Sequence, residues 1–212
     1  MTLRDQAYDT FTEQLLNREI SLGQFVSQRE LVKLTGMPLG AIREMIPRLE
    51  ADGLIRPVPN RGLQIMQADL GIIRNAFQLR SVLEREAVRT FVTVASDAEL
   101  AELRERHLAI RAEAAGGVTP ELLARAQQMD WNMHDRMIDA LGNDLISSIY
   151  RTNSIKIRLI RNEDTRMLPE LVVSVMDEHL ALIDALETRD PDKAEAALNA
   201  HLDSAIQRVV RI

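Results

Sequence analysis

Two residues one helical turn apart, Asp130 and His134, give the first chemical signal in the sequence. Residues four apart share one face of a helix, so the carboxylate and the imidazole can converge on a single point. Such a pair either forms a hydrogen bond on a polar helix face or supplies two ligands for a metal ion. The residues that turn this helix toward a protein core are Met129, Met133, Met137, Ile138 and Leu141.

Two further histidines lie on either side of a predicted turn at Asp190. His179 precedes that turn and His201 follows it by about eleven residues each, so in an antiparallel helix pair both lie about 16 Å from the turn. Both sit in apolar helix registers, and buried imidazoles at one level need polar partners or a cation. With Asp130 and His134 they would supply three imidazoles and one carboxylate, a set suited to zinc, nickel, manganese or iron.

The fourth histidine, His107, lies among charged residues in "LRERHLAIR", and we interpret it as a surface residue. The chain holds no cysteine, which excludes disulfides and thiolate ligands, so any metal must be bound through nitrogen and oxygen. The start "MTLRDQAYDTF" has no secretory signal, and no apolar run approaches the roughly 18 residues of a membrane span. We therefore expect a cytoplasmic protein.

The composition is that of a globular protein, since 46% of the 212 residues are hydrophobic and 27% are charged. The formal net charge of -6 argues against a nucleic-acid partner, because binding to phosphates needs lysine and arginine. The acid excess is confined to one part of the chain, however. Residues 1–68 hold 8 basic and 8 acidic residues, whereas residues 69–212 hold 18 and 24. A DNA-binding function for the first part therefore stays open.

Residues 1–68 combine helices with a strand pair. Ser27 and Glu30 form a capping box that starts one short helix, and Gly36 supplies the turn that ends it. A second helix runs from Pro38 through "LGAIREMIPRLEADG", and "PNRG" joins two apolar segments as a hairpin. This order predicts a winged helix-turn-helix, whose second helix fits the DNA major groove. The arginines placed to touch DNA are Arg29, Arg43 and Arg61, with Arg48 as a weaker candidate.

Residues 69–212 predict only helices. Capping and turn residues, such as Ser96 with Glu99 and the Gly116-Gly117 pair, mark the boundaries between them. The segments cover residues 69–95, 97–115, 120–141, 144–163, 169–188 and 191–211. Their short connections favour antiparallel neighbours. The predicted fold class is therefore mainly α, with a winged helix-turn-helix domain at 1–68 and an all-α antiparallel six-helix bundle at 69–212.

The run "SQRELVKLTGMPLGAIREMIPRLEADGLIRPVPNRGLQIM" resembles the DNA-binding domain of the GntR family of bacterial transcription regulators, with a match over residues 3–67. The residues that this resemblance implies in contact with DNA are Arg29, Arg43, Arg61 and Gly62. At the start of the recognition helix the family usually has Ser-Arg, where this chain has Pro38-Leu39. One phosphate or base contact of the family is therefore missing here.

The second part, over residues 70–212, resembles the metal-binding version of the FadR C-terminal (FCD) domain, and its six helices bring it nearer the VanR-like branch. The implied ligands of a divalent metal, zinc before nickel, manganese or iron, are Asp130, His134, His179 and His201. The resemblance also implies a small carboxylate effector at the open coordination sites. The arginine of the family's "R..LE..A" run often faces that effector, and it matches Arg80 here. A salt bridge from Arg80 to Glu84 is the alternative.

Three functions are compatible with these features. The first is a ligand-responsive transcription regulator and not an enzyme, a homodimer that binds a double-stranded DNA operator, a divalent metal and a small carboxylate, without a membrane partner. The second is a metal-dependent phosphohydrolase of HD type, based on the adjacent pair His134-Asp135, although Asp135 faces about 100° away around the helix. The third is a regulator whose helical domain only dimerises, with the histidines as a hydrogen-bonded core cluster. The sequence favours the first.

Overall fold

The structure, a computed structural model, describes residues 2–67, 69–163 and 168–210, and most of them are helical. Contacts between Cα atoms divide the chain into two units, Met1–Ile73 with Ile155–Asn162 and Arg74–Ser154 with Glu163–Ile212. None of the described helices combines the length and the apolar character that a membrane crossing requires. The fold class predicted as mainly α is confirmed.

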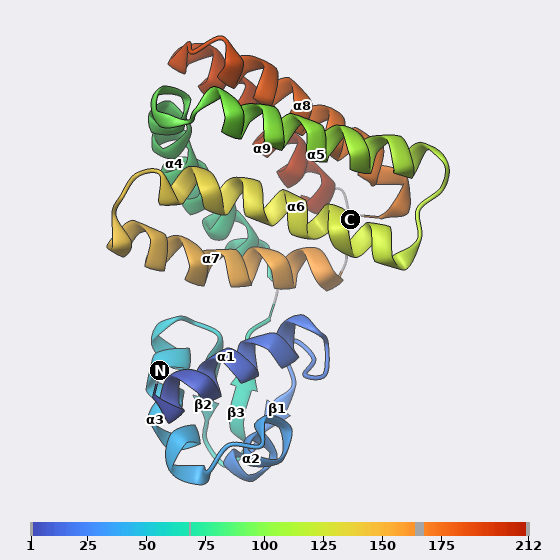
Figure 1. The fold of residues 1–212 in the computed structure, drawn as a ribbon. Coiled ribbons are helices and arrows are strands. Elements are labelled where there is room, and N and C mark those ends of the chain that lie inside the picture. Colours follow the sequence, from blue (N-terminus) through green and yellow to red (C-terminus); the bar gives the residue numbers. More distant parts are fainter. Residues whose placement is uncertain (1, 68, 164–167, 211–212) are drawn as a thin grey trace. The chain divides into compact units, whose positions relative to one another are not determined.

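The first unit contains a small sheet among short helices. Its elements in chain order are α1 Leu3–Leu16, β1 Phe25–Val26, α2 Gln28–Thr35, α3 Leu39–Ala51, β2 Ile55–Val58 and β3 Gly62–Ile65 (Figure 1). Strand β3 lies between the other two strands and pairs with both in antiparallel register. The predicted hairpin is present as β2 and β3. Strand β1 was not predicted, because two residues are too few for an alternating pattern.

Short-range contacts fix where α2 begins and where β3 can pass. The Ser27 hydroxyl accepts the N–H of Glu30 at 3.2 Å, and the Glu30 carboxylate accepts the N–H of Ser27 at 2.7 Å, which is the predicted capping box. Gly36 ends α2 with a φ of 67°. Gly62 has a φ of 89°, and a Cβ atom there would lie 2.8 Å from the carbonyl oxygen of Val26. The close pairing of β1 and β3 therefore requires glycine at this position.

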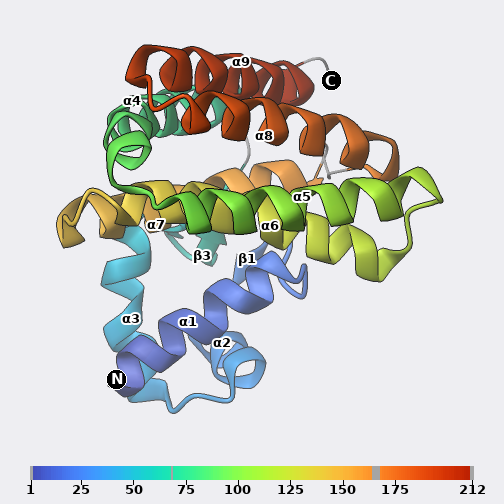
Figure 2. The same cartoon turned by 45° about the horizontal axis from the view of Figure 1, so that its top comes forward.

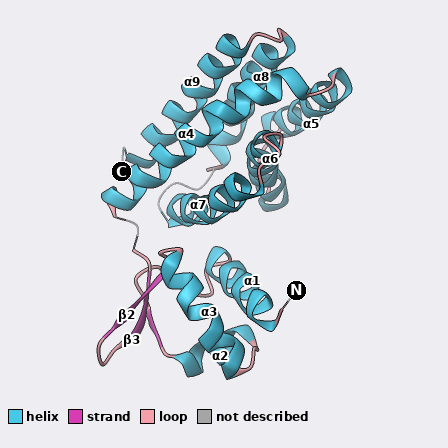
Figure 3. Cartoon of the chain, turned by 90° about the vertical axis from the view of Figure 1, so that its left-hand side faces the viewer, coloured by secondary structure: helices cyan, strands magenta, loops and turns pink. Residues whose placement is uncertain are grey.

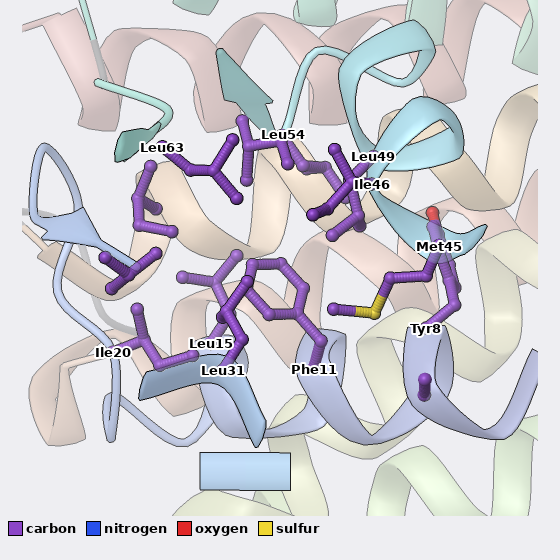
Figure 4. Packing of buried hydrophobic residues seen from close by; sticks show 14 of the residues in the cluster. Tyr8, Phe11, Leu15, Ile20, Leu31, Met45, Ile46, Leu49, Leu54 and Leu63 are labelled. Carbon is purple, nitrogen blue, oxygen red and sulfur yellow. The ribbon is translucent and has the colours of Figure 1, made fainter. Parts of the chain in front are cut away.

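The core of the first unit joins one face of each helix to the sheet. Phe11 and Leu15 of α1 pack with Met45 and Leu49 of α3, and Leu63 of β3 lies in the same cluster (Figure 4). An apolar stripe of α3, formed by Ile42, Met45, Ile46 and Leu49, is buried. Because that stripe faces the core, the opposite face of α3 stays exposed to solvent.

From residue 70 on, the described chain is helical, and the described strands all lie before it (Figures 2 and 3). The α-helices are α4 Leu70–Val94, α5 Asp97–Ala115, α6 Pro120–Asp139, α7 Asp144–Glu163, α8 Val172–Glu187 and α9 Pro191–Val210. Their bounds follow the predicted segments to within about two residues, with one larger difference. The segment predicted at 169–188 divides into a short 3-10 helix at Pro169–Leu171 and then α8. Pro169 can begin a helical turn because it needs no hydrogen-bond acceptor there.

Helix α8 packs against three other helices of the second unit. Helices α5, α6 and α9 all pack against it, and α5 also packs against α6. Figure 2 shows α5 and α8 running alongside each other. Ser96 caps α5 through the N–H of Glu99, and Thr119 caps α6 through the N–H of Leu122, each at 3.2 Å. These caps set the registers of α5 and α6.

Candidate metal centre

Four polar side chains that are far apart in the chain lie together inside the second unit. Asp130 and His134 come from α6, His179 from α8 and His201 from α9. Their exposed fractions are 1%, 2%, 0% and 3%, respectively. Each offers one ligand atom, and these atoms all lie within 4.8 Å of one another. The structure thus brings together the four residues whose types and spacing the sequence singled out.

The spacing of these ligand atoms fits a small divalent ion. Nε2 of His134 lies 3.2 Å from Nε2 of His201 and 4.0 Å from Oδ1 of Asp130. That oxygen lies 3.3 Å from Nε2 of His179. Ligands about 2.0–2.2 Å from zinc lie about 2.8–3.6 Å apart when adjacent and about 4.2 Å apart when opposite. Nε2 of His179 and Nδ1 of His134 are both buried and fulfil no hydrogen-bond geometry with the described residues, so the distances between the ligand atoms are what indicates a shared ion.

Two of the three imidazoles are held at their other nitrogen by carboxylates. Nδ1 of His134 lies 2.9 Å from Oε2 of Glu84, and Nδ1 of His201 lies 2.9 Å from Oε2 of Glu178. A carboxylate at Nδ1 keeps the proton on that atom and leaves the lone pair on Nε2. Glu178 could not be recognised from the sequence, because it precedes His179 directly but contacts His201 on the neighbouring helix.

The third imidazole is held by His107, and the prediction that His107 lies on the surface is wrong. Its side chain is 0% exposed, and its Nε2 lies 3.2 Å from Nδ1 of His179. Its Nδ1 lies 2.6 Å from the carbonyl oxygen of Leu103. The charged residues beside His107 belong to the solvent face of α5, whereas its own face carries Leu100, Leu103, Ile110 and Ala114. That spacing of three and four residues was the signal for burial.

Burial lowers the pKa of all four histidines below the ordinary value. It is the largest influence on His134, His179 and His201, and it brings the pKa of His107 to about 4. Nearby carboxylates raise the pKa of each ring but do not cancel the cost of burying a charge. The rings are therefore neutral at pH 7, which is the form that offers a lone pair to a metal.

Glu84 connects the cluster to a buried ion pair. Its Oε1 accepts hydrogen bonds from Nε of Arg80 at 2.7 Å and from the hydroxyl of Tyr150 at 2.5 Å. The side chains of Arg80 and Glu84 are 4% and 0% exposed. Burial would raise the pKa of Glu84, but Arg80 and His134 hold it well below its ordinary range. The salt bridge between Arg80 and Glu84, which was the alternative role for Arg80, is thus present. Contact between Arg80 and an effector stays a prediction.

The residues predicted to touch DNA are all exposed, and they are Arg29 in α2, Arg43 in α3, and Arg61 with Gly62 at the β2–β3 hairpin. Nε of Arg43 donates to the side-chain oxygen of Gln28 at 3.2 Å. The Arg61 guanidinium lies 3.8 Å from the centre of the Phe25 ring. Both contacts are on the surface, so the arginines are accessible to a partner of the first unit.

Arg48, the weaker candidate, is engaged within the first unit. Its guanidinium lies 3.8 Å from the centre of the Tyr8 ring, and its Nη1 lies 3.5 Å from Oδ1 of Asp5. Both partners belong to α1. Arg48 therefore helps to hold α3 against α1, and this contact explains an arginine at that position without a DNA partner.

The family model described as the FCD domain matches residues 75–204, which is more than half of the chain. The chain belongs to the FCD domain family. A relative by sequence is the Nta operon transcriptional regulator of Aminobacter aminovorans, 24% identical over 193 residues that cover 90% of this chain and 86% of that protein. Relatives of this kind are HTH-type transcriptional regulators, which confirms the resemblance to the GntR family.

Solved structures share the fold. The E. coli protein McbR/YncC matches with a TM-score of 0.77 at 16% identity, over 100% of this chain and 98% of that chain. The Zn²⁺-bound FCD domain of TM0439, described as a transcriptional regulator, matches with a TM-score of 0.50 at 23% identity, over 68% of this chain and 96% of that chain. The FCD protein is thus a transcriptional regulator and not an enzyme.

The alternative of a phosphohydrolase is therefore wrong. That alternative was based on the pair His134-Asp135, whereas the buried cluster contains Asp130 and not Asp135.

Proposed function

We propose that this FCD protein is a DNA-binding regulator whose helical domain binds a divalent metal and a small carboxylate. Residues 1–68 would form a winged helix-turn-helix, and residues 69–212 the effector and dimerisation domain. The observation that carries the proposal is the buried set of three imidazoles and one carboxylate, with each imidazole held at Nδ1. A cluster that only filled the core would not need all three Nε2 atoms to face one point.

The residues proposed to hold the metal are Asp130 through a carboxylate oxygen and His134, His179 and His201 through Nε2. Imidazole nitrogen and carboxylate oxygen ligands suit zinc, nickel, manganese and iron, and the Zn²⁺-bound domain of TM0439 makes zinc the first candidate. When bound, the ion would act as a Lewis acid that attracts an anionic ligand. Four protein ligands leave a position free in a five- or six-coordinate ion.

The charges around the cluster favour a small anion as the effector. Arg80 and Glu84 cancel each other, as do Glu178 and Arg208, which form an ion pair. The neutral histidines add no charge, and Asp130 adds one negative charge. A divalent ion would therefore leave one surplus positive charge in a buried place, where an uncompensated charge is costly. One carboxylate on the ion would neutralise it.

Arg80 is the proposed partner of the effector carboxylate. The described hydrogen bonds of its guanidinium use Nε alone, which donates to Glu84 at 2.7 Å. The two terminal nitrogens would then be available for a second carboxylate, and the planar guanidinium suits paired hydrogen bonds to such a group. The effector carboxylate would thus bind both to the metal and to Arg80. Arg80 contacts Glu84, which in turn lies against the proposed ligand His134.

The proposed operator contacts come from Arg29, Arg43, Arg61 and Gly62 on the first unit. Their exposure and the balanced charge of residues 1–68 support contact with phosphates and base edges. A homodimer would place two recognition helices on a two-fold operator about one helical turn apart. The effector can change operator affinity only through different affinities for the arrangements of the protein that bind and release DNA.

Metal analysis of the purified protein tests the helical domain. We expect a stoichiometric divalent ion in the wild type and a loss of at least about 100-fold in affinity in His179→Ala, because ligands matter more than their outer contacts. Leu182→Ala is the matched control, because Leu182 is a buried residue of the same helix that lies outside the cluster. A wild-type protein that binds no divalent ion would support the domain that only dimerises.

Fluorescence anisotropy with labelled DNA from the neighbouring promoter tests the first unit. We expect sequence-specific binding at moderate salt, and a weakening of about 5- to 100-fold in Arg43→Ala if the side chain contacts a base. Arg106→Ala is the control, since Arg106 is an exposed arginine of the helical domain. Equal binding to unrelated DNA of the same length would contradict a specific regulator.

A further inference from the structure

We propose that His107 is a positioning residue of the metal centre, through which the carbonyl oxygen of Leu103 fixes the tautomer of His179. The inference rests on the proposed metal binding and names a residue that the ligand set does not include. Its basis is a chain of two contacts, 2.6 Å from Leu103 O to Nδ1 of His107 and 3.2 Å from Nε2 of His107 to Nδ1 of His179.

The direction of each hydrogen bond in this chain is forced. A carbonyl oxygen only accepts, so Nδ1 of His107 carries its proton and donates it to Leu103. In a neutral ring the other nitrogen, Nε2, then has a lone pair and accepts a hydrogen bond. Nδ1 of His179 is then the donor in this contact, which leaves the lone pair of His179 on Nε2 and opposes the Asp130 carboxylate, which would otherwise draw the proton to Nε2. That is the atom at 3.3 Å from Asp130.

The opposite arrangement would close the site to a metal. A proton on Nε2 of His107 would place the lone pair of its Nδ1 against the Leu103 carbonyl oxygen, which is repulsive. It would also make His179 accept at Nδ1 and carry its own proton on Nε2, where a metal must bind. The helical backbone of α5 thus selects the ligating form of a residue on α8 through one intervening ring.

The three histidine ligands differ in what holds them. His134 and His201 face carboxylates, Glu84 and Glu178, whereas His179 faces the neutral ring of His107. A carboxylate keeps Nδ1 protonated by its charge and tolerates some change in geometry. A neutral imidazole does so only through its own tautomer, so the His179 ligand depends on an intact contact between His107 and Leu103.

The first experiment reads the tautomers directly. Long-range proton–nitrogen NMR correlation of the metal-free protein, with labelled histidine, identifies the protonated nitrogen of each ring. We expect the proton on Nδ1 in both His107 and His179, and in His107→Leu a mixture of tautomers at His179. A proton on Nε2 of His107, or an unchanged single tautomer of His179 in the variant, would overturn the inference.

The second experiment measures zinc affinity by competition with a chromogenic chelator. We expect His107→Leu to weaken zinc binding about 10- to 100-fold, the usual effect of losing an outer contact. We expect His107→Gln to restore part of it, because its amide oxygen can accept from Nδ1 of His179. Leu100→Ala, also buried on α5, controls for loss of core packing.

The outcomes separate this inference from the proposed function. A wild-type protein without zinc affinity contradicts the proposed metal binding, whereas the NMR experiment still tests the tautomers. Wild-type zinc binding that stays equal in His107→Leu overturns the role of His107 and leaves the four ligands in place. The visible spectrum of the cobalt-loaded protein adds a check, because it should change in His107→Leu and stay unchanged in Leu100→Ala.

Discussion

The buried arginine of the helical unit and the exposed arginines of the first unit stand in opposite situations. Arg80 is 4% exposed and donates to Glu84, which in turn faces His134. Arg43 is exposed, and its one described contact is a hydrogen bond to Gln28 at the surface. In the buried region each charge needs a defined partner, because burial shields it from bulk solvent. At the surface water serves instead, and the side chain stays available for a partner.

Burial decides how closely the geometry of a side chain indicates its function. The buried cluster is a closed set of contacts whose distances are compatible with the proposed metal ion, and each histidine ring has defined neighbours at both nitrogens. The exposed arginines do not define their partner in the same way, because a solvated side chain adopts its functional position only when the partner binds. The comparison predicts large effects on stability for changes in the buried set and small ones at the surface.

The largest effect should follow removal of one partner from the buried ion pair. Glu84→Leu leaves the Arg80 charge buried without its carboxylate, and we expect a loss of about 3–5 kcal/mol in the free energy of unfolding. Denaturant unfolding measures it. The exposed pair Glu102 and Arg106, 3.4 Å apart, is the control, and Glu102→Ala should cost at most about 1 kcal/mol.

A double variant sharpens the same comparison. Arg80→Met with Glu84→Leu removes both charges, so it should be more stable than Glu84→Leu alone. A double variant as unstable as Glu84→Leu would show that lost packing, and not the unpaired charge, causes the effect. Equal losses in Glu84→Leu and Glu102→Ala would remove the contrast between buried and exposed pairs.

The metal-free protein should lose stability in mild acid. The folded protein lowers the pKa of His107 to about 4, whereas the unfolded chain has an ordinary value near about 6.5. Between these values the unfolded chain binds a proton that the folded one does not, so stability falls as the pH falls. His107 alone should contribute about 1.4 kcal/mol per pH unit inside this window and little outside it.

Thermal and denaturant unfolding in the presence of a chelator, from pH 8 to pH 4, measure this dependence. The other three histidines have lowered pKa values as well, so they should steepen the loss. The variant His107→Leu removes one titrating group and should show a smaller slope. A flat stability profile through this range would contradict burial of neutral histidines.

A smaller effect on stability is expected at Gly62, where glycine is needed either for the backbone conformation or for contact with DNA. Gly62→Ala would place a Cβ atom 2.8 Å from the Val26 carbonyl oxygen at a φ of 89°, so we expect a loss of about 1–3 kcal/mol. Gly40→Ala is the control, because nothing lies within 4 Å of its Cβ position and helical alanine is preferred. Unchanged stability with weakened DNA binding in Gly62→Ala would make its role one of contact alone.

The proximity of Asp130, His134, His179 and His201 could be predicted from the sequence, whereas their role as metal ligands stays a prediction. Asp130 and His134 share a helix face, and His179 and His201 lie equally far from one turn, so helix geometry alone brings them together. The boundaries of the long helices were also predictable, because capping residues mark them. Only the start of α8 differed, where Pro169 begins a separate short helix.

What holds the ligands could not be predicted in the same way. Contacts such as Glu178 with His201 and His107 with His179 depend on the relative rotation of neighbouring helices, which the sequence does not state. The burial of His107 was hidden by its charged neighbours, although its helical spacing indicated it. Strand β1 could not be predicted, because two residues are too few to show the alternation of a strand. It is defined by its pairing with β3.

A crystal structure with anomalous diffraction at the absorption edge of the bound metal would locate the ion in the protein. We predict one strong anomalous peak per chain, about 2.0–2.2 Å from Nε2 of His134, His179 and His201 and from a carboxylate oxygen of Asp130. A metal located elsewhere in the chain, or hydrogen bonds among these side chains in place of a metal in crystals grown with excess zinc, would contradict the account.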